Sequence, residues 1–249
     1  VPDADDTACA TTALKKLTPN SSEAKNAVKN GIQWLLGIQN NDGGFPTFCK
    51  GWTQLPFDKS CPDITAHSIS AFSSWIDQMD ANLSLKMKKS IDKALKYLEQ
   101  SQEANGSWSP LWFGNENAPE KKNPVFGTAL VLKYISQTPF SNSANLAKCL
   151  ANGYEYLRIS QNADGGWGGI KGLPSTIEES AVALSAIMSF KKTANYPSVE
   201  KGIIFLTEKI KNAESILPTS PIGLYFASLW YYEELYPLIF SVEAIKLYF

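Results

Sequence analysis

The sequence has few residues with which to bind a metal: one histidine, His67, and four cysteines among 249 residues. A single imidazole excludes a histidine pair and a His-rich metal centre. The cysteines form no C-x-x-C pair, which argues against a zinc cluster and against the disulfide framework of a small secreted domain. They are Cys9, Cys49, Cys61 and Cys149. We therefore expect reduced thiols in a cytoplasmic protein, and no metal site.

An excess of charge and a long apolar run are also missing. The 23 Lys+Arg and 24 Asp+Glu give a formal net charge of −1, which leaves no basic surface for nucleic acid. No apolar stretch approaches the roughly 18 to 20 residues that a bilayer-spanning helix requires. With 44% hydrophobic and 19% charged residues the composition is that of a globular protein, and we expect one domain over residues 1–249.

Aromatic residues, in contrast, are abundant, with 7 Trp, 10 Tyr and 12 Phe, and some of them belong to a repeat. Its core is Gln-x-x-x-Gly-x-aromatic, preceded by an aromatic-Leu pair, and it occupies residues 31–45, 94–108 and 153–167. A fourth copy begins at Gly202 and decays where Ile210 replaces the glutamine. Since the copies are too far apart for single helices, each unit fits a helix–loop–helix pair.

Each copy predicts a helix that ends near the glutamine, a turn with glycine at positive φ, and an aromatic side chain that folds back onto the helix. We expect Trp108 and Trp167 to pack against helix ends on the outside of the fold. Gln102 and Gln161 would hydrogen-bond to backbone groups there. These residues would then stabilise the fold and would not line a site.

Between the repeats, apolar residues recur with helical spacing, and no strand is required. The predicted helices are 4–18, 22–38, 63–79, 84–101, 124–137, 143–160, 175–191, 197–212, 222–235 and 237–248. A capping box of Ser175 and Glu178 supports the start of the seventh. Alternating inner and outer helices joined by a repeated turn predict an all-α fold, an α/α toroid. Function is expected on the long loops 40–62 and 103–123.

Three carboxylates, Asp3, Asp5 and Asp6, lie within one helical turn near the start of the chain. Acidic residues at a helix start complement the helix dipole and cap free N–H groups, which is their commoner role. A second interpretation is a general acid, because crowded carboxylates cannot all ionise and one retains its proton near neutral pH. The residues alone leave both interpretations open.

His67 follows Asp63 by four residues, so on a helix the two share a face and the carboxylate can hold an imidazolium. A lone histidine is more often structural, and this alternative also stays open. The aromatic residues from position 112 onward are core by default, but they would also suit a dry pocket that tolerates positive charge. They are Trp112, Phe113, Phe126, Tyr225, Phe226, Trp230, Tyr231, Tyr232 and Tyr236.

Taken together, the motifs resemble those of squalene-hopene cyclases and oxidosqualene cyclases. The Gln-x-x-x-Gly-x-Trp repeats are similar to the QW motifs of these enzymes, and residues 3–8, D-A-D-D-T-A, match the D-x-D-D-T-A motif of the squalene-hopene branch. Further matches follow in the family's order: D-I-T-A-H at 63–67, W-F-G at 112–114, F-G-T at 126–128 and Y-P at 236–237. The resemblance covers nearly the whole chain and corresponds to the C-terminal catalytic domain.

This resemblance implies a class II terpene cyclase, which starts the cyclisation of an isoprenoid lipid by protonating a terminal alkene. Asp5 would be the acid, with Asp3 and Asp6 tuning it. His67 would support the carboxylate left after proton transfer. We therefore expect Asp5 to be buried in a cavity within hydrogen-bond reach of His67, directly or through one water, with Asp3 and Asp6 adjacent. Because an alkene is a very weak base, the acid must keep its proton and leave a stabilised anion in a dry pocket. Aromatic faces would stabilise the carbocations, and no metal or redox cofactor is implied.

Three segments depart from the family's pattern. Residues 115–122 replace a short arginine-tryptophan stretch, so a pocket tryptophan is missing. Residues 178–182, E-E-S-A-V, are closer to the E-E-T-A form of other bacterial cyclases than to S-Q-T-A-W, and residues 220–224 lack the phenylalanine of G-T-G-F-P. The substrate-binding residues that the resemblance implies are Phe48, Asp63, Trp112, Phe126, Tyr225 and Tyr232.

These departures leave the substrate open between a squalene-like polyprene and another prenyl chain such as a prenyl diphosphate. A diphosphate would need a basic pocket and usually Mg²⁺, and the sequence has no compact Lys/Arg cluster. A protein prenyltransferase β-subunit, which shares Gly-Gly-Phe repeats, has a zinc site built from an Asp, a Cys and a His. This alternative is disfavoured, because the single histidine here belongs to the D-I-T-A-H segment and no Asp-x-Cys occurs. A non-catalytic toroid used as an interaction surface is favoured only if Asp5 is exposed and far from His67.

We also expect the chain to be a fragment. A closed toroid of six helix pairs needs twelve helices, fewer are predicted, and the D-x-D-D motif begins at residue 3. Family members carry a second helical barrel upstream. Residues 1–249 should therefore form an incomplete toroid with an open apolar seam near the N-terminal helix, and should be inactive alone. Family members take lipids from one membrane leaflet, which leaves a peripheral position on the inner membrane face open.

Overall fold

The computed structural model describes residues 2–52, 56–191, 196–213, 216–224 and 228–249, and these are mostly helical. The α-helices are α1 (Ala4–Leu17), α2 (Ser22–Ile38), α3 (Pro62–Trp75), α4 (Ala81–Ser101), α5 (Pro124–Ser136), α6 (Ala144–Ser160), α7 (Ile177–Lys191), α8 (Pro197–Lys211) and α9 (Leu235–Tyr248). Two antiparallel hairpins are formed by β1 (Phe45–Pro46) with β2 (Ser60–Cys61) and by β3 (Ile222–Leu224) with β4 (Leu229–Tyr231). Short 3₁₀ turns are η1 (Pro56–Asp58), η2 (Ile76–Gln78), η3 (Pro119–Lys121) and η4 (Pro139–Asn142).

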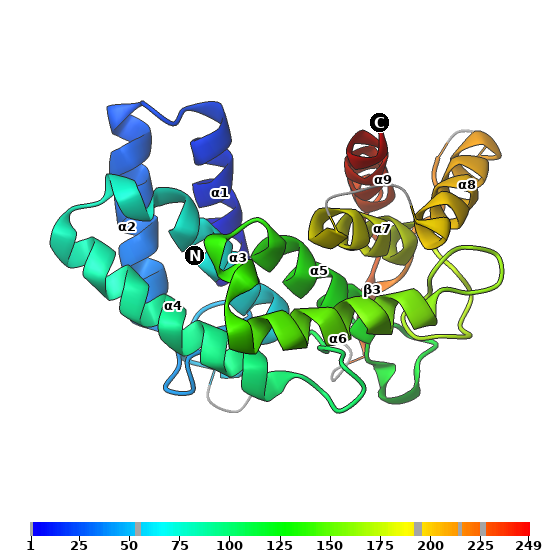
Figure 1. Ribbon diagram of the computed structural model, residues 1–249, viewed down its shortest axis with the longest axis horizontal. Coiled ribbons are helices and arrows are strands. Elements are labelled where there is room, and N and C mark those ends of the chain that lie inside the picture. Colours follow the sequence, from blue (N-terminus) through cyan, green and yellow to red (C-terminus); the bar gives the residue numbers. More distant parts are fainter. Residues whose placement is uncertain (1, 53–55, 192–195, 214–215, 225–227) are drawn as a thin grey trace.

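The helices form two layers (Figure 1). In the inner layer α3, α5 and α7 pack side by side, with α1 against α3 and α9 against α7; α2, α4, α6 and α8 lie outside them. Inner helices are buried around most of their circumference, and in α7 every residue from Ile177 to Met188 is buried, Glu178 and Glu179 included. The predicted all-α fold of toroid type, with alternating inner and outer helices, is confirmed.

The helix pairs follow an arc from α1 and α2 at one end to α8 and α9 at the other (Figure 1). Helix α9 is as apolar as an inner helix, but its main packing partner is α7 alone. Its exposed apolar side chains are Leu235, Leu238, Ile239, Val242 and Leu247. An exposed apolar patch therefore lies on α9, and the open seam near the N-terminal helix stays a prediction.

The repeated glutamine joins its own turn to the next outer helix. Gln102 Nε2 donates to the carbonyl oxygens of Gly106, at 2.9 Å, and of Cys149 in α6, at 2.7 Å. The first and third repeats have the same pair of contacts, from Gln39 to Gly43 and Ser90 and from Gln161 to Gly165 and Ser198. The glycine at the turn takes a φ near 90°, as predicted.

The tryptophans of the second and third repeats fill the space between an outer and an inner helix. Trp167 Nε1 donates to the Leu157 carbonyl of α6, and the Trp167 backbone N–H donates to Ser180 Oγ of α7, at 2.7 and 2.8 Å. Trp108 makes the same contacts with Leu98 and Thr128. Both rings are fully buried, so they pack on helices as predicted but lie between the layers and not on the outside.

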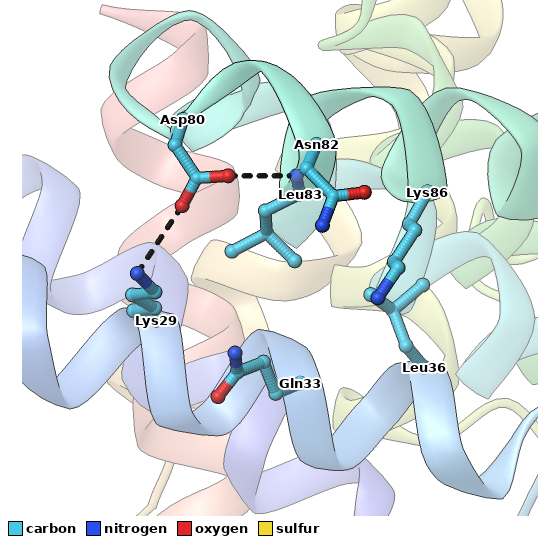
Figure 2. A pocket seen from close by; sticks show the side chains of 7 residues that line it. All are labelled: Lys29, Gln33, Leu36, Asp80, Asn82, Leu83 and Lys86. Carbon is cyan, nitrogen blue, oxygen red and sulfur yellow. Dashed lines mark hydrogen bonds and ion pairs between the residues drawn. The ribbon is translucent and has the colours of Figure 1, made fainter.

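Outer helices α2 and α4 meet around a cavity of about 360 Å³, shown in Figure 2. Asp80 accepts from the Leu83 backbone N–H at 2.9 Å and so caps α4, and Lys29 Nζ lies 3.2 Å from the other Asp80 oxygen. These two bonds, the backbone one first, lower the pKa of Asp80. The cap also explains why α4 begins before residue 84, where the sequence predicts its start.

The predicted helix over 222–235 is wrong, as is the expectation of no strands, because this segment contains the β3–β4 hairpin. Pro218 and Pro221 prevent a helix from entering the segment, and Gly223 has a φ of 142°, which an L side chain rarely adopts. A Cβ at Gly223 would also lie 2.1 Å from the Leu229 carbonyl oxygen. Among the described residues the structure thus has nine α-helices where the sequence predicts ten.

The capping box at the start of α7 is displaced by one residue from the prediction. Thr176 Oγ1 accepts from the Glu179 backbone N–H at 3.2 Å and also contacts the Glu179 carboxylate. Ser175 instead donates to Asp164 in the preceding turn. Glu178 is therefore free to bind a different part of the chain.

Candidate active site

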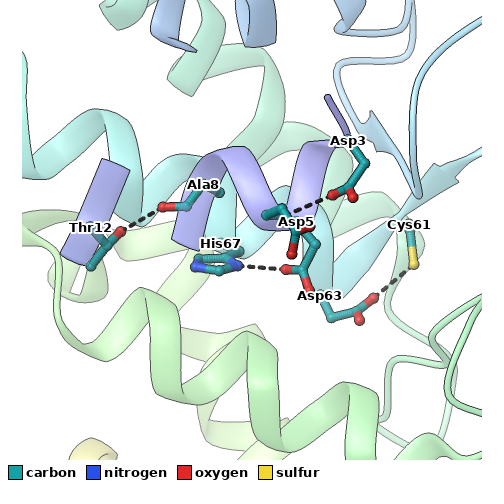
Figure 3. Close-up of polar contacts among 8 residues, drawn as sticks. Asp3, Asp5, Ala8, Thr12, Cys61, Asp63 and His67 are labelled. Carbon is teal, nitrogen blue, oxygen red and sulfur yellow. Dashed lines mark hydrogen bonds and ion pairs between the residues drawn. The ribbon is translucent and has the colours of Figure 1, made fainter. Parts of the chain in front are cut away.

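In the acidic cluster, one carboxylate caps a helix and another does not. Asp3 is the N-cap of α1 and its Oδ1 accepts from the Asp6 backbone N–H at 2.7 Å, so the capping interpretation holds for Asp3. Burial raises the pKa of Asp3, and the nearby charge of Asp6 adds to the increase. Asp5 caps nothing, and its side chain turns toward α3 (Figure 3).

Asp5 meets His67 across the contact between α1 and α3 (Figure 3). His67 Nδ1 lies 2.7 Å from Asp5 Oδ1, a contact between residues far apart in sequence that confirms the predicted hydrogen bond. The His67 side chain is 6% exposed, whereas that of Asp5 is 47% exposed. The expectation that Asp5 is buried is therefore wrong for residues 1–249, because the described part of the chain covers one side of this carboxylate.

The carboxylate of α3, Asp63, does not hold His67 as the helical spacing suggested. Its Oδ1 accepts from the Cys61 thiol at 2.7 Å, and its Oδ2 is buried without a partner. Burial raises the pKa of Asp63 to about 6, with the Asp5 charge adding to the increase. Asp63 is therefore a buried acid near the acidic cluster, and it does not line the cavity beside that cluster.

A cavity of about 180 Å³ opens beside the acidic cluster and has mainly aromatic walls. It is lined by Asp3, Asp5, Asp6, Thr47, Phe48, Ile64, Trp112, Phe113, Tyr231 and Tyr236. Phe48 contacts the Trp112 ring edge to face, with centroids 4.5 Å apart, and Trp112 Nε1 donates to the Tyr231 hydroxyl at 2.7 Å. Three carboxylates and five aromatic rings thus surround one small space.

The five aromatic residues predicted to bind substrate differ in where the structure places them. Phe48 and Trp112 line the cavity, while Phe126 lies behind it and stacks on Phe113 with centroids 4.4 Å apart. Tyr232 is 61% exposed and outside the cavity, because it follows the end of β4, whose last residue, Tyr231, lines the cavity. Tyr225 lies outside the described residues.

Sequence reasoning missed Tyr134, which fixes the histidine ring. The rings of Tyr134, on α5, and His67 are stacked with centroids 4.1 Å apart and planes 5° apart. Burial raises the pKa of Tyr134 well above its usual value, so the ring stays neutral. Its helical position, two turns after Phe126, was the available signal.

Within the described residues, no group of three or more His, Cys, Asp and Glu side chains could hold a metal ion. All four cysteines are free thiols in the structure. In the same part of the chain, no helix combines the length and the apolar character needed to cross a bilayer.

The profile of the squalene-hopene cyclase C-terminal domain matches residues 1–245. The chain belongs to this family. Its relatives are class II terpene cyclases, and a terpene cyclase–glycosyl transferase fusion protein of Humicola fuscoatra is 31% identical over 82% of this chain and 16% of its own length. The squalene-hopene cyclase of Zymomonas mobilis is 29% identical over 83% of this chain and 32% of its own.

Solved structures agree with the family in fold. The ent-copalyl diphosphate synthase of Streptomyces platensis has a TM-score of 0.71 at 17% identity, over 99% of this chain and 41% of its own length. A type II terpene cyclase of Scytonema has a TM-score of 0.68 at 12% identity, over 98% of this chain and 73% of its own. The chain spans about a third or less of the two curated relatives named above.

The three segments that depart from the squalene-hopene cyclase pattern meet in the structure. Asn115, in the segment 115–122, donates from Nδ2 to Glu179 at 3.1 Å, and Ser220 donates to Glu178 through both its N–H and its hydroxyl. Burial, helped by the Glu178 charge, raises the pKa of Glu179 to about 7. No sequence spacing predicts this junction, because its members are 42 and 64 residues apart.

Proposed function

We propose that residues 1–249 supply the acid and part of the aromatic pocket of a class II terpene cyclase. One observation carries the proposal: Asp5 touches the buried His67 at 2.7 Å and at the same time lines a cavity with aromatic walls. Carboxylates that only cap a helix would not require the His67 imidazole beside Asp5. The contact also counts against a non-catalytic interaction domain, although the exposure of Asp5 alone would favour one.

The reaction begins when the Asp5 O–H bond breaks and its proton bonds to the terminal carbon of an alkene, whose π electrons form the new C–H bond. A tertiary carbocation and the Asp5 carboxylate result. The His67 N–H stabilises this carboxylate by donating to it, since the developing charge lies 2.7 Å away. The faces of Phe48, Trp112 and Tyr231 stabilise the cation without a basic lone pair that would end the reaction early.

The substrate that we propose is a squalene-like polyprene, supported by the squalene-hopene cyclases among the relatives. The second candidate is a prenyl diphosphate, because a drimenyl diphosphate synthase of Streptomyces showdoensis is 26% identical over 83% of this chain. A diphosphate with Mg²⁺ needs cationic partners, and no Lys or Arg is among the residues lining the cavity. A polyprene needs only the aromatic wall.

We further propose that protein outside residues 1–249, an upstream second barrel, completes the pocket, because half of Asp5 is open to solvent here. Cyclisation requires that water be kept from the cation. A cytoplasmic enzyme that takes its lipid from the inner membrane face is consistent with this proposal. Cosedimentation with vesicles tests the membrane position.

The substrate test uses the longest native form of the protein with squalene, oxidosqualene and a prenyl diphosphate series, the last with and without Mg²⁺. Products are separated by gas chromatography and identified by mass spectrometry. A cyclic triterpene from squalene supports the first candidate, and a cyclic prenyl diphosphate supports the second. No cyclic product from any substrate contradicts the proposed cyclase and favours an interaction domain.

A further inference from the structure

Helix α7 begins with two adjacent glutamates, Glu178 and Glu179, that are each 3% exposed and do not line the cavity. Buried carboxylates are costly unless hydrogen bonds satisfy them. Here each one binds a separate segment of the chain, so their partners show what the pair does.

Glu178 holds the entry to the β3–β4 hairpin. Its Oε1 accepts from the Ser220 backbone N–H at 2.7 Å, and its Oε2 accepts from the Ser220 hydroxyl at 2.8 Å. Both oxygens are therefore committed to one residue, two positions before Ile222 begins β3. This two-point attachment sets both the position and the direction of the chain that enters the hairpin.

Glu179 holds the other segment, the loop that precedes α5. Its Oε1 accepts from the side-chain amides of Asn115, at 3.1 Å, and Asn123, at 3.0 Å, while Oε2 contacts the Thr176 hydroxyl. Asn123 also caps α5, through the Phe126 backbone N–H at 3.1 Å. Both ends of the loop 115–123 are thus attached to a single carboxylate.

The position of Glu178 in the repeat shows why its side chain lies near the candidate site. In α3, α5 and α7 one hydroxyl accepts from the repeat's aromatic backbone N–H: Thr65, Thr128 and Ser180. Two residues before this hydroxyl lie Asp63, Phe126 and Glu178, respectively. Glu178 therefore occupies the α7 equivalent of two positions that adjoin the candidate site.

The two attached segments together form one wall of the cavity. Trp112 and Phe113 immediately precede the loop held by Glu179, and Tyr231 lies in the hairpin held by Glu178. The Gly114 N–H donates to the Gly223 carbonyl at 3.2 Å, and Trp112 Nε1 donates to the Tyr231 hydroxyl at 2.7 Å. A shift of either segment would separate these rings.

We propose that Glu178 and Glu179 are positioning residues that align the loop and the hairpin so that Trp112 and Tyr231 form a continuous aromatic wall, and that they thereby determine the ring pattern of the product. Only the effect on the ring pattern of the product rests on the proposed function. Alignment of the wall is a property of the folded chain and can be measured without turnover.

Hydrogen bonding, and not charge, performs this role, which makes glutamine the conservative replacement. In Glu178→Gln the amide oxygen accepts from the Ser220 N–H and the amide nitrogen donates to the Ser220 hydroxyl. In Glu179→Gln the oxygen accepts from both asparagines and the nitrogen donates to Thr176. Alanine at either position keeps none of these bonds, and Ser220→Ala is a milder variant that loses only the hydroxyl contact.

Hydrogen exchange by mass spectrometry on the full-length protein tests the alignment. We expect Glu178→Ala to speed exchange about tenfold in peptides covering 217–224, and Glu179→Ala to do so in 111–123, with the glutamine variants close to wild type. Ser180→Ala is the matched control, because it also removes a buried hydrogen bond from α7, but one to Trp167. If Glu178→Ala does not fold, Ser220→Ala replaces it.

Unchanged exchange in both segments of the alanine variants, or equal changes in the Ser180→Ala control, would overturn the alignment. The second readout is the product ratio with the accepted substrate. We expect the alanine variants to shift it at least severalfold, and the glutamine variants to restore it. An unshifted ratio with faster exchange would overturn the role in product choice. A wild type without cyclic product would refute the proposed function while the exchange result still decides the alignment.

Discussion

Among single residues, the neighbouring carboxylates of the site differ in their hydrogen-bond partners. Asp3 and Asp6 are joined by a capping hydrogen bond, Asp5 is joined to His67, and Asp63 is buried with a thiol as its partner. Identical chemical groups therefore have different surroundings: Asp3 caps a helix, Asp5 is the proposed proton donor and Asp63 is a buried acid.

Asp5→Asn should abolish cyclisation in the longest native form and barely change stability. The amide oxygen can still accept from His67, but the side chain has no acidic proton. Since Asp5 is 47% exposed, its ion pair contributes little, and we expect the melting temperature to move by no more than about 2–4 °C. Asp92→Asn, an exposed position on α4, is the control for both measurements. Turnover by Asp5→Asn at the wild-type rate would assign the acid to another residue.

Asp63 should make folding pH-dependent, because its pKa is about 6 in the folded protein and 3.8 as the reference value. A raised pKa favours folding at low pH, and this contribution is lost as the pH rises from about 4 through 6. Relative to wild type, Asp63→Asn should therefore gain about 2–4 kcal/mol of stability between pH 4 and pH 8. Denaturant unfolding at both pH values measures it. A difference that does not change with pH would contradict the burial of this carboxyl.

At the scale of elements, the fold depends on a junction repeated three times. A glutamine at the end of an outer helix binds its own turn and the next outer helix, and the aromatic residue after the turn binds the following inner helix. One local motif thus connects three helices. This explains why the repeat could be found in the sequence, and why it stabilises the fold without lining the site.

Trp167→Ala should reduce the free energy of unfolding by about 3–5 kcal/mol, because it empties a fully buried space between α6 and α7 and removes the hydrogen bond from the indole N–H to the Leu157 carbonyl. Products of the surviving enzyme should not change. Trp52→Ala, at a side chain that is 47% exposed, is the control and should cost about 1–2 kcal/mol. A new product at unchanged stability would show instead that Trp167 contributes to the pocket.

At the scale of the whole molecule, the arc of helix pairs leaves two surfaces open. Asp5 is half-exposed at the α1 end, and α9 exposes five large apolar side chains at the other. An acid that must protonate an alkene works in a dry site, and contiguous exposed apolar surface is unusual for a protein that functions alone. Both surfaces agree with the proposal that further protein covers this domain.

Residues 1–249 alone should therefore give no cyclic product above background from any polyprene, whereas a longer form that includes the upstream barrel should. Water would reach Asp5 and any cation in the shorter form. Both forms are compared with the same substrate by gas chromatography and mass spectrometry, after intact-mass analysis of each. Efficient cyclisation by a homogeneous 249-residue chain would show that the pocket is complete without additional protein.

Local spacing is enough to identify the helical repeat, the turn glycines, the inner and outer helices and the motifs that contain Asp5 and His67, because a single chain displays such spacing directly. Tertiary packing decides that His67 binds Asp5 and not Asp63, that Tyr231 and not Tyr232 lines the cavity, and that residues 222–224 pair with 229–231 as antiparallel strands. Such outcomes depend on packing between segments far apart in sequence, and no local period carries that information.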